Sequence, residues 1–196
     1  MQRIAKVNRV TKETNVSLKL NLDGKGKYKI STTIPFLDHM LEQFAFHGSF
    51  DLYIKAYGDT DVDDHHLVED IGLCLGTALF KSLGDKSGIN RYAEVLTPMD
   101  EALSYVVVDI SGRPNLVYNV KFFPEYKKSA FDYRLIREFL KSFVNEGKIT
   151  LHIKVVAGED NHHICESIFK SLGRALGQAV CRKKSIRSIP TTKGKL

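Results

Sequence analysis

Apolar side chains recur along the first 88 residues with two different periods. Alternation of apolar and polar residues is typical of half-buried strands, and it predicts strands at residues 3–10, 14–22, 27–33 and 52–57. A spacing of three to four residues is typical of amphipathic helices, and it predicts helices from Pro35 to about His47 and from Asp64 to about Leu83. The first half of the chain therefore reads strand, strand, strand, helix, strand, helix.

Residues with turn and capping chemistry define the expected boundaries of these elements. The run Asp23-Gly24-Lys25-Gly26 predicts a hairpin turn between the second and third strands. Pro35 suits the first turn of a helix, and Asp64 is expected to cap the second helix. A Gly-rich linker at residues 84–88 then leads into the rest of the chain.

The same order of elements returns in the second half. Strands are predicted near 94–100, 103–110, 115–122 and 149–156, and helices near 132–146 and 161–181. Glu13 aligns with Glu101 in one register, and His39–Gly48 aligns with Glu138–Gly147 in a second. We therefore predict an internally duplicated α/β (α+β) fold, in which each half is a four-stranded sheet with two helices on one face (βββαβα). The expected units are residues 1–88, residues 89–190 and a C-terminal tail at 191–196.

Two histidine-rich tetrads open the second helix of each half, His65-His66-x-x-Glu69 and His162-His163-x-x-Glu166. Residues four apart lie only ~40° apart around a helix axis, so the first histidine and the glutamate of each tetrad can hold one ion. The neighbouring histidine points roughly 100° away and is expected to reach a second metal. Imidazole and carboxylate ligands suit Mn, Fe, Co, Ni or Zn better than Mg or Ca.

The alternative interpretation of the tetrads is a pair of solvated helix N-termini, capped by Asp64 and Asn161. Because the pattern occurs in two aligned copies, we favour the metal site.

Composition and charge exclude several classes of protein. The chain has 196 residues, 43% of them hydrophobic, but no apolar run approaches the ~20 residues that span a bilayer, and its N-terminus is unlike a signal peptide. Cys74, Cys165 and Cys181 form no CxxC motif and are expected to be buried thiols in a reducing, cytoplasmic setting. The net charge is +6, with a basic run at residues 182–187. A nucleic-acid arm is disfavoured because no aromatic residues or binding motif accompany this run.

Seven segments, which follow one another along the whole chain, resemble the imidazoleglycerol-phosphate dehydratases of histidine biosynthesis. They are Arg9–Thr14, Pro35–Leu41, Asp64–Asp70, Asp109–Pro114, Leu151–Lys154, Asn161–Glu166 and Pro190–Gly194. The resemblance implies a lyase that removes water from imidazole glycerol phosphate to give imidazole acetol phosphate. It also implies two Mn ions per active site, with active sites shared within a homo-oligomer of about 24 subunits.

The resemblance further implies two crossed sets of metal ligands. One ion would be held by His39, His66, His162 and Glu166, and the other by His65, Glu69, Glu138 and His163. Glu138 departs from the family pattern, in which this position is commonly a histidine, although a carboxylate can also bind Mn. The alternative for Glu138 is an ordinary exposed helix position between Arg137 and Lys141.

The expected reaction is metal-assisted formation of an imidazolate-like state, with a carboxylate to handle the proton. By resemblance the catalytic carboxylates are Glu13, Glu69 and Glu166. The residues expected to bind substrate are Glu13, His39, His47, Arg91, Arg113, Lys170, Thr191, Thr192 and Lys193. Arginine suits phosphate because its guanidinium donates two parallel hydrogen bonds. His152, within a strand, is expected to be structural.

Two other functions use similar residues. A dinuclear metallohydrolase acting on a small phosphorylated substrate would also need His and carboxylate ligands. A structural shell, in which metal ions only join subunits, is the non-enzymatic alternative.

Overall fold

The computed structural model describes residues 3–124, 131–183 and 188–194. In the first half, the strands are β1 (Ile4–Val10), β2 (Thr14–Asn21), β3 (Tyr28–Ser31) and β4 (Asp51–Gly58), and the helices are α1 (Pro35–Gly48) and α2 (His65–Leu83). In the second half, the strands are β5 (Tyr92–Met99), β6 (Ala102–Asp109), β7 (Asn115–Asn119) and β8 (Thr150–Ala157), and the helices are α3 (Leu135–Gly147) and α4 (Asn161–Val180). Both halves thus have the order βββαβα, which confirms the predicted duplicated fold.

The two sheets have matching topologies, with strand orders β1-β2-β4-β3 and β5-β6-β8-β7. The predicted hairpin at Asp23–Gly26 is wrong, because β4 lies between β2 and β3 and runs parallel to β3. The loop packs instead on the start of β4, where the Asp51 carboxylate accepts hydrogen bonds from the backbone N–H groups of Lys25 (2.8 Å) and Lys27 (3.2 Å). A Cβ atom at Gly24 would lie 2.2 Å from the Asp51 nitrogen, so only glycine fits there.

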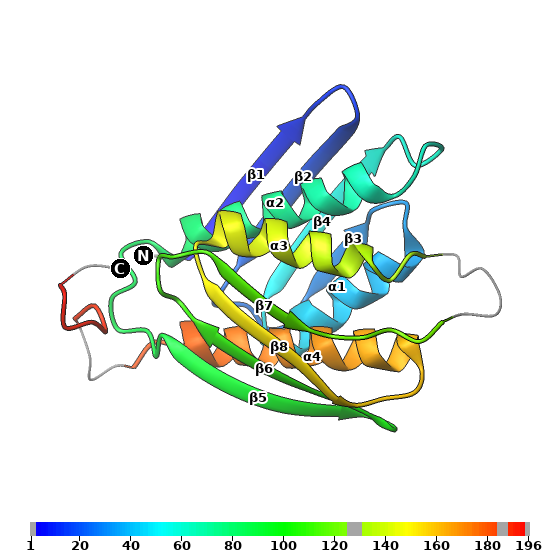
Figure 1. The fold of residues 1–196 in the computed structure, drawn as a ribbon. Helices are drawn as coiled ribbons and strands as arrows, with labels where there is room; N and C mark the ends of the chain where they lie inside the picture. Colours follow the sequence, from blue (N-terminus) through cyan, green and yellow to red (C-terminus); the bar gives the residue numbers. More distant parts are fainter. Residues whose placement is uncertain (1–2, 125–130, 184–187, 195–196) are drawn as a thin grey trace.

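The four helices lie between the two sheets (Figure 1). Each half places its own helices against its own sheet, and the helices then pair across the halves, α2 with α3 and α1 with α4. Glycines allow the close approach: a Cβ atom at Gly76 would lie 2.4 Å from the Phe143 carbonyl oxygen, and one at Gly173 would lie 2.5 Å from that of Phe44. These four residues occupy equivalent positions in the two halves, so the two helix pairs are related by the duplication.

Alternating strand residues face the helices and form the core. Val16, Leu18 and Leu20 of β2, and Val106 and Val108 of β6, are buried. Helices α2 and α4 both begin at the end of the molecule that is remote from the two chain termini (Figure 1). The fold therefore brings the two tetrads to the same end of the molecule.

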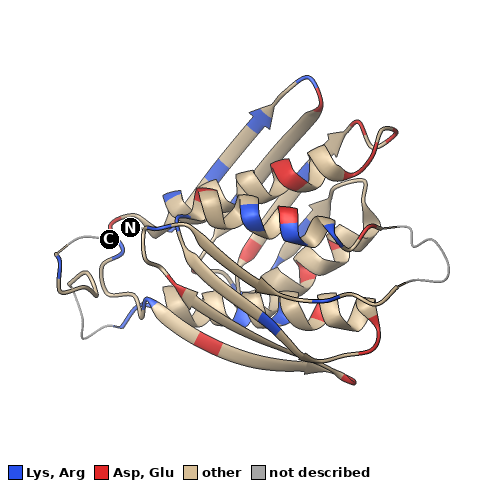
Figure 2. Cartoon of the chain, in the orientation of Figure 1, with Lys and Arg blue, Asp and Glu red and all other residues tan. Residues whose placement is uncertain are grey.

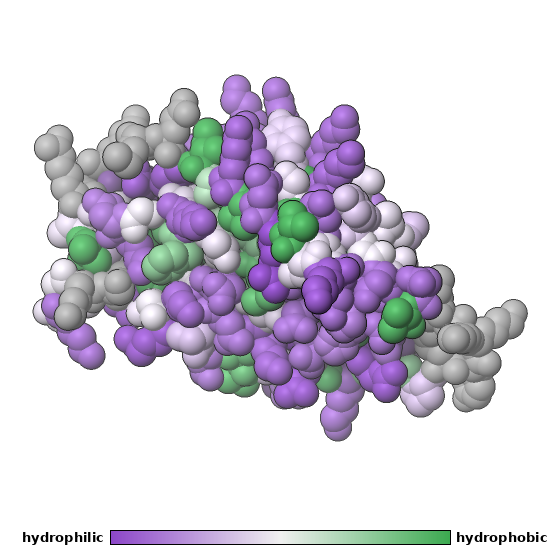
Figure 3. Space-filling view, turned by 90° about the horizontal axis from the view of Figure 1, so that it is seen from above, coloured by the Kyte–Doolittle hydropathy of each residue, from purple (hydrophilic) through white to green (hydrophobic). Residues whose placement is uncertain are grey.

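Acidic residues gather at this end, in the loops that lead into α2 and α4 (Figure 2). The face seen from above is mostly hydrophilic, with apolar side chains in separate small patches (Figure 3). Among the described residues, no helix is long and apolar enough to cross a membrane. Much of the basic run, residues 184–187, lies outside the described residues, as do residues 195–196 of the predicted tail.

One of the three predicted buried thiols is in fact exposed. Cys74 and Cys165 lie in the core, and burial raises the pKa of both thiols. Cys181 is exposed because it follows the last residue of α4, where the chain becomes extended and leaves the core.

Candidate active site

Helices α1 and α4 bring three potential metal ligands together, His39 from α1 with His162 and Glu166 from α4. The Nε2 atoms of His39 and His162 each lie 3.4 Å from Oε2 of Glu166, and the ligand atoms all lie within 4.8 Å of one another. No other such group of three occurs among the described residues. Two imidazoles and a carboxylate in this arrangement suit a transition-metal ion.

Lys170, one turn beyond Glu166, forms an ion pair with that carboxylate. Its Nζ lies 2.8 Å from Oε1 of Glu166, while both histidines contact Oε2. Burial raises the pKa of Glu166, but the Lys170 ammonium and His39 outweigh burial and lower it below the ordinary value. The carboxylate is therefore ionised near neutral pH, as a metal ligand must be.

The related set, on α2 and α3, is more open. His65 Nε2 lies 3.6 Å from Oε2 of Glu69, and the two side chains are 45% and 46% exposed, against 9% for Glu166. Glu138, the counterpart of His39, lies in the first turn of α3 and forms an ion pair with Lys141 at 3.5 Å. The role of Glu138 as a ligand stays a prediction.

His66 and His163, the second histidine of each tetrad, lie apart from the group of three. Each contacts a carboxylate through Nδ1: His66 lies 3.0 Å from Oδ2 of Asp59, and His163 lies 2.7 Å from Oε2 of Glu101. These hydrogen bonds raise the pKa of both histidines. Sequence reasoning missed Asp59 and Glu101 as partners, although the alignment of Glu101 with Glu13 marked an acidic residue at both hairpin turns.

The capping residues differ from those predicted. Asp160 caps α4, since its Oδ1 accepts hydrogen bonds from the backbone N–H groups of His162 (2.7 Å) and His163 (3.1 Å), and Asn161 is the first helical residue. Asp64 makes no side-chain capping bond because its own backbone is already helical. Asp63 instead accepts from the backbone N–H of His65 at 2.8 Å.

The predicted phosphate-binding residues come together at the other end of the molecule. A cavity of about 460 Å³ is lined by Arg91, Tyr92, Arg113, Pro190, Thr191, Thr192 and Lys193. Arg91 donates from Nε to Oδ1 of Asp109 at 2.7 Å and from Nη1 to the carbonyl oxygen of Pro190 at 3.0 Å. Two arginines, a lysine and two hydroxyls make this cavity suitable for an anion.

The length of one helix separates the cavity from the candidate metal ligands. The backbone N–H of Arg91 donates to the carbonyl of Ala179, near the end of α4, whereas Glu166 lies near its beginning. The two positions are thirteen residues apart, which corresponds to ~20 Å along a helix. Within one chain, the cavity and the ligand group thus lie toward opposite ends of α4.

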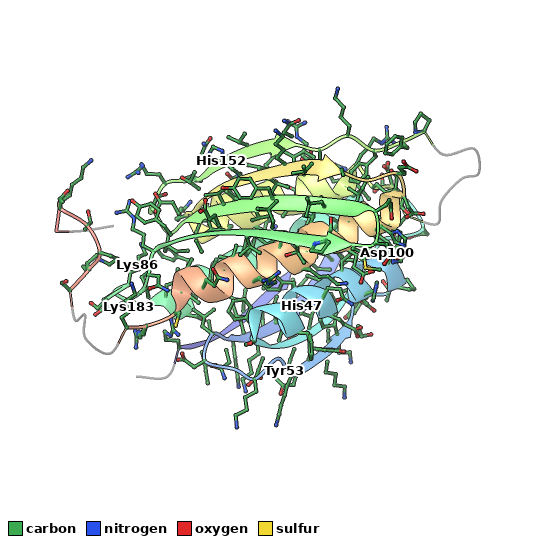
Figure 4. The ribbon with its side chains drawn as sticks, turned by 90° about the horizontal axis from the view of Figure 1, so that it is seen from below. His47, Tyr53, Lys86, Asp100, His152 and Lys183 are labelled. Atoms are coloured by element: carbon green, nitrogen blue, oxygen red, sulfur yellow. The ribbon has the colours of Figure 1, made fainter. Side chains whose placement is uncertain are left out.

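Three other predicted residues occupy different surroundings. Glu13 is exposed at the turn between β1 and β2, and its backbone oxygen accepts from the N–H of Asp59 at 3.1 Å. His47 lies near Lys170 and Arg174, and its pKa is lowered by burial and by these two cations. His152 is exposed on β8, on the side of the sheet away from the helices (Figure 4).

The fold and these clusters define a class, a duplicated α/β protein with a candidate His-His-Glu metal centre and a separate anion cavity. Comparison with known proteins narrows the class. Residues 32–176 match the family model of imidazoleglycerol-phosphate dehydratase. The chain is 52% identical over 196 residues, with 100% of both chains covered, to the imidazoleglycerol-phosphate dehydratase of Citrifermentans bemidjiense. It therefore belongs to the imidazoleglycerol-phosphate dehydratase family, the hydro-lyases of histidine biosynthesis.

Solved structures agree with this assignment. The Staphylococcus aureus imidazoleglycerol-phosphate dehydratase has a TM-score of 0.82 and 38% identity, with 92% of this chain and 99% of that chain covered. The Pyrococcus furiosus enzyme, solved in complex with (S)-C348, has a TM-score of 0.82 and 37% identity, covering 97% and 100%. A pea relative, 51% identical over 195 residues, is described as chloroplastic.

Proposed function

We propose that this chain dehydrates imidazole glycerol phosphate to imidazole acetol phosphate, with Mn as its metal and with its active sites built from more than one copy of the chain. The observation that carries the proposal is the group formed by His39, His162 and Glu166, whose ligand atoms lie within 4.8 Å of one another. We place the protein in the cytoplasm and regard residues 1–88 and 89–190 as the duplicated units.

The residues that would hold metal are the two crossed sets, His39, His66, His162 and Glu166, and His65, Glu69, Glu138 and His163. When bound, the metal supplies Lewis acidity toward the substrate imidazole and so favours its imidazolate-like form. The protein already supplies an ionised Glu166, which Lys170 holds by one oxygen while the other remains toward the two histidines.

Glu13 is the carboxylate that we assign to proton transfer. Its exposure leaves it free to meet a substrate, and its charge acts on His66 strongly enough to contribute to the raised pKa of that residue. The carboxylates of Glu69 and Glu166 act beside it at the ligand positions. Arg91, Arg113, Thr191, Thr192 and Lys193 bind the phosphate, and Lys170 and His47 complete the substrate contacts.

The distance between the two clusters supports an assembled active site. An imidazole and a phosphate joined by a three-carbon chain are separated by about six bonds of ~1.5 Å, so they span less than ~9 Å. The ligand group and the cavity of one chain lie ~20 Å apart along α4. One substrate molecule therefore bridges the ligand end of one copy and the phosphate cavity of another, consistent with an oligomer of about 24 subunits.

A single assay tests this function. Mn-loaded protein is incubated with imidazole glycerol phosphate, and both imidazole acetol phosphate and inorganic phosphate are measured. We expect the ketone product without phosphate release, whereas phosphate release would support the metallohydrolase instead. His162→Ala should lose metal and turnover together, and Lys183→Ala, a change at an exposed residue that belongs to neither cluster, should not. Saturable turnover also excludes a purely structural shell.

A further inference from the structure

The second histidine of each tetrad is held by a carboxylate from another part of its own half. Nδ1 of His66 lies 3.0 Å and 3.3 Å from the two carboxylate oxygens of Asp59, in the loop after β4. Nδ1 of His163 lies 2.7 Å from Oε2 of Glu101, in the turn between β5 and β6. Nε2, the other ring nitrogen, is left to bind a different group; in His163 it lies 3.9 Å from Oδ2 of Asp100, which is too long for a hydrogen bond.

An ionised carboxylate can only accept hydrogen bonds, so Nδ1 must carry the proton in each neutral imidazole. The lone pair then resides on Nε2, which is the form that binds a metal ion. A carboxylate that holds a ligating histidine in this way also limits ring rotation and raises the basicity of the ring. The two contacts thus select both the tautomer and the direction of the ligand.

The two halves reach this arrangement from different positions. Glu101 lies in the hairpin turn of the second half, and its counterpart in the first half is Glu13. His66 is held by Asp59 instead, whose backbone N–H donates to the Glu13 carbonyl. In the second half the hairpin carboxylate, Glu101, therefore contacts a histidine, whereas in the first half Asp59 makes this contact in place of the hairpin carboxylate, Glu13.

We propose that Asp59 and Glu101 are positioning residues that fix the metal-binding tautomer of His66 and His163, and that Asp59 thereby frees Glu13 for contact with substrate. The proposal rests on the assignment of these histidines as metal ligands in the proposed function.

A second contact of Glu101 makes a sharp test possible. Its Oε1 accepts hydrogen bonds from the backbone N–H groups of Glu159 (3.2 Å) and Asp160 (2.9 Å). In Glu101→Gln, these two donors require the amide oxygen on their side, which turns the amide NH₂ toward Nδ1 of His163. Nδ1 must then accept, the proton moves to Nε2, and the nitrogen needed for metal is blocked. In Glu101→Ala, water can accept from Nδ1, so the metal-binding tautomer survives.

The experiment measures Mn²⁺ affinity from free Mn²⁺ by electron paramagnetic resonance, and thermal stability of the metal-free protein, for the full chain and both variants. Loss of an outer partner of a ligand typically lowers metal affinity 10- to 100-fold, and we expect Glu101→Gln to lie in about this range. Affinity should fall in the order wild type, Ala, Gln, whereas stability should fall in the order wild type, Gln, Ala. A purely structural role predicts that Ala is worse in both measurements, and that result would overturn the proposal.

Matched controls and a ligand variant complete the design. Glu159→Gln, in the loop before α4, and Asp61→Asn, in the loop before α2, remove a charge from exposed positions and should leave Mn²⁺ affinity unchanged. Asp59→Ala, which removes both oxygens from Nδ1 of His66, should lower Mn²⁺ affinity through the other histidine. If His163→Ala also keeps full Mn²⁺ affinity, the metal assignment itself fails. If only His163→Ala loses metal while Glu101→Gln binds normally, the proposed function stands and the positioning role is refuted.

Discussion

Gly173→Ala should loosen the contact between α1 and α4 and weaken metal binding through it. The new Cβ atom would lie 2.5 Å from the carbonyl oxygen of Phe44, a backbone atom that cannot rotate away. Overpacking of this kind costs about 1–3 kcal/mol, whereas replacing a helical glycine by alanine returns about 1 kcal/mol. The net loss of about 0–2 kcal/mol corresponds to a fall in melting temperature of up to ~8 °C for a chain of this size.

The same displacement reaches the candidate metal centre, because Phe44 and His39 belong to the same helix. We therefore expect lower Mn²⁺ affinity as well as a lower melting temperature, measured by differential scanning calorimetry and metal titration. Gly147→Ala is the matched control, since a Cβ atom there would have its nearest neighbour at an ordinary 3.4 Å. If Gly173→Ala melts at or above the temperature of Gly147→Ala, the close helix contact does not limit this position and the reasoning is refuted.

Three further outcomes are expected. Arg113→Ala should raise KM by ~10- to 150-fold, which is the loss expected for one charge-assisted contact to phosphate, and should leave the metal content unchanged. If a substrate that lacks the phosphate shows an equal increase in KM, Arg113 has a structural role instead. Glu138→Gln should weaken one metal site selectively and Glu138→His should restore it, as a metal titration would measure; a metal-bound structure with Glu138 directed to solvent would contradict this. The pKa of Asp23 is lowered in the folded protein because its carboxylate accepts hydrogen bonds from Arg3. Asp23 therefore stabilises the fold at pH values above its unfolded pKa, near 3.8, and this stabilisation is lost as the pH falls through the lower pKa of the folded state. Asp23→Asn should therefore show a shallower loss of stability in acid unfolding, and an unchanged acid slope would show that the Arg3 pair has no such effect.

Periodicity predicted the elements well because both periods report local geometry. The pairs four apart behave as helix geometry requires, with His162 and His65 lying 3.4 Å and 3.6 Å from their glutamates. The order of strands in a sheet could not be predicted in this way, because alternation shows which face of a strand is buried but not which strand lies beside it. The predicted hairpin at Asp23–Gly26 failed for this reason, since the parallel pairing of β3 with β4 depends on α1 crossing between them.

The pattern of apolar and polar residues also could not predict contacts between residues that are far apart in the sequence. The approach of His39 to Glu166 requires α1 and α4 to pack closely. Gly173 permits this packing because it faces the Phe44 carbonyl, but the sequence does not show that these two helices are neighbours. The contacts of Asp59 and Glu101 with histidines needed the loops to fold back over the helix N-termini. The side chains that cap the two helices lie one position before the predicted ones. At α2, for example, the carboxylate of Asp63 rather than that of Asp64 accepts the backbone hydrogen bond.

The duplication makes the two candidate metal sets related but not equal. Because α1 packs on α4 and α2 on α3, each helix pair combines one helix from each half, so neither half contains a complete pair. Lys170 neutralises part of the charge on Glu166, whereas Leu73 occupies the equivalent position one turn beyond Glu69. The α2–α3 pair also has Glu138 where the α1–α4 pair has His39, so it carries two carboxylates and no lysine at the position equivalent to Lys170. A more anionic ligand set attracts a divalent cation more strongly, and the two sets should therefore fill with Mn²⁺ at different concentrations rather than as identical sites.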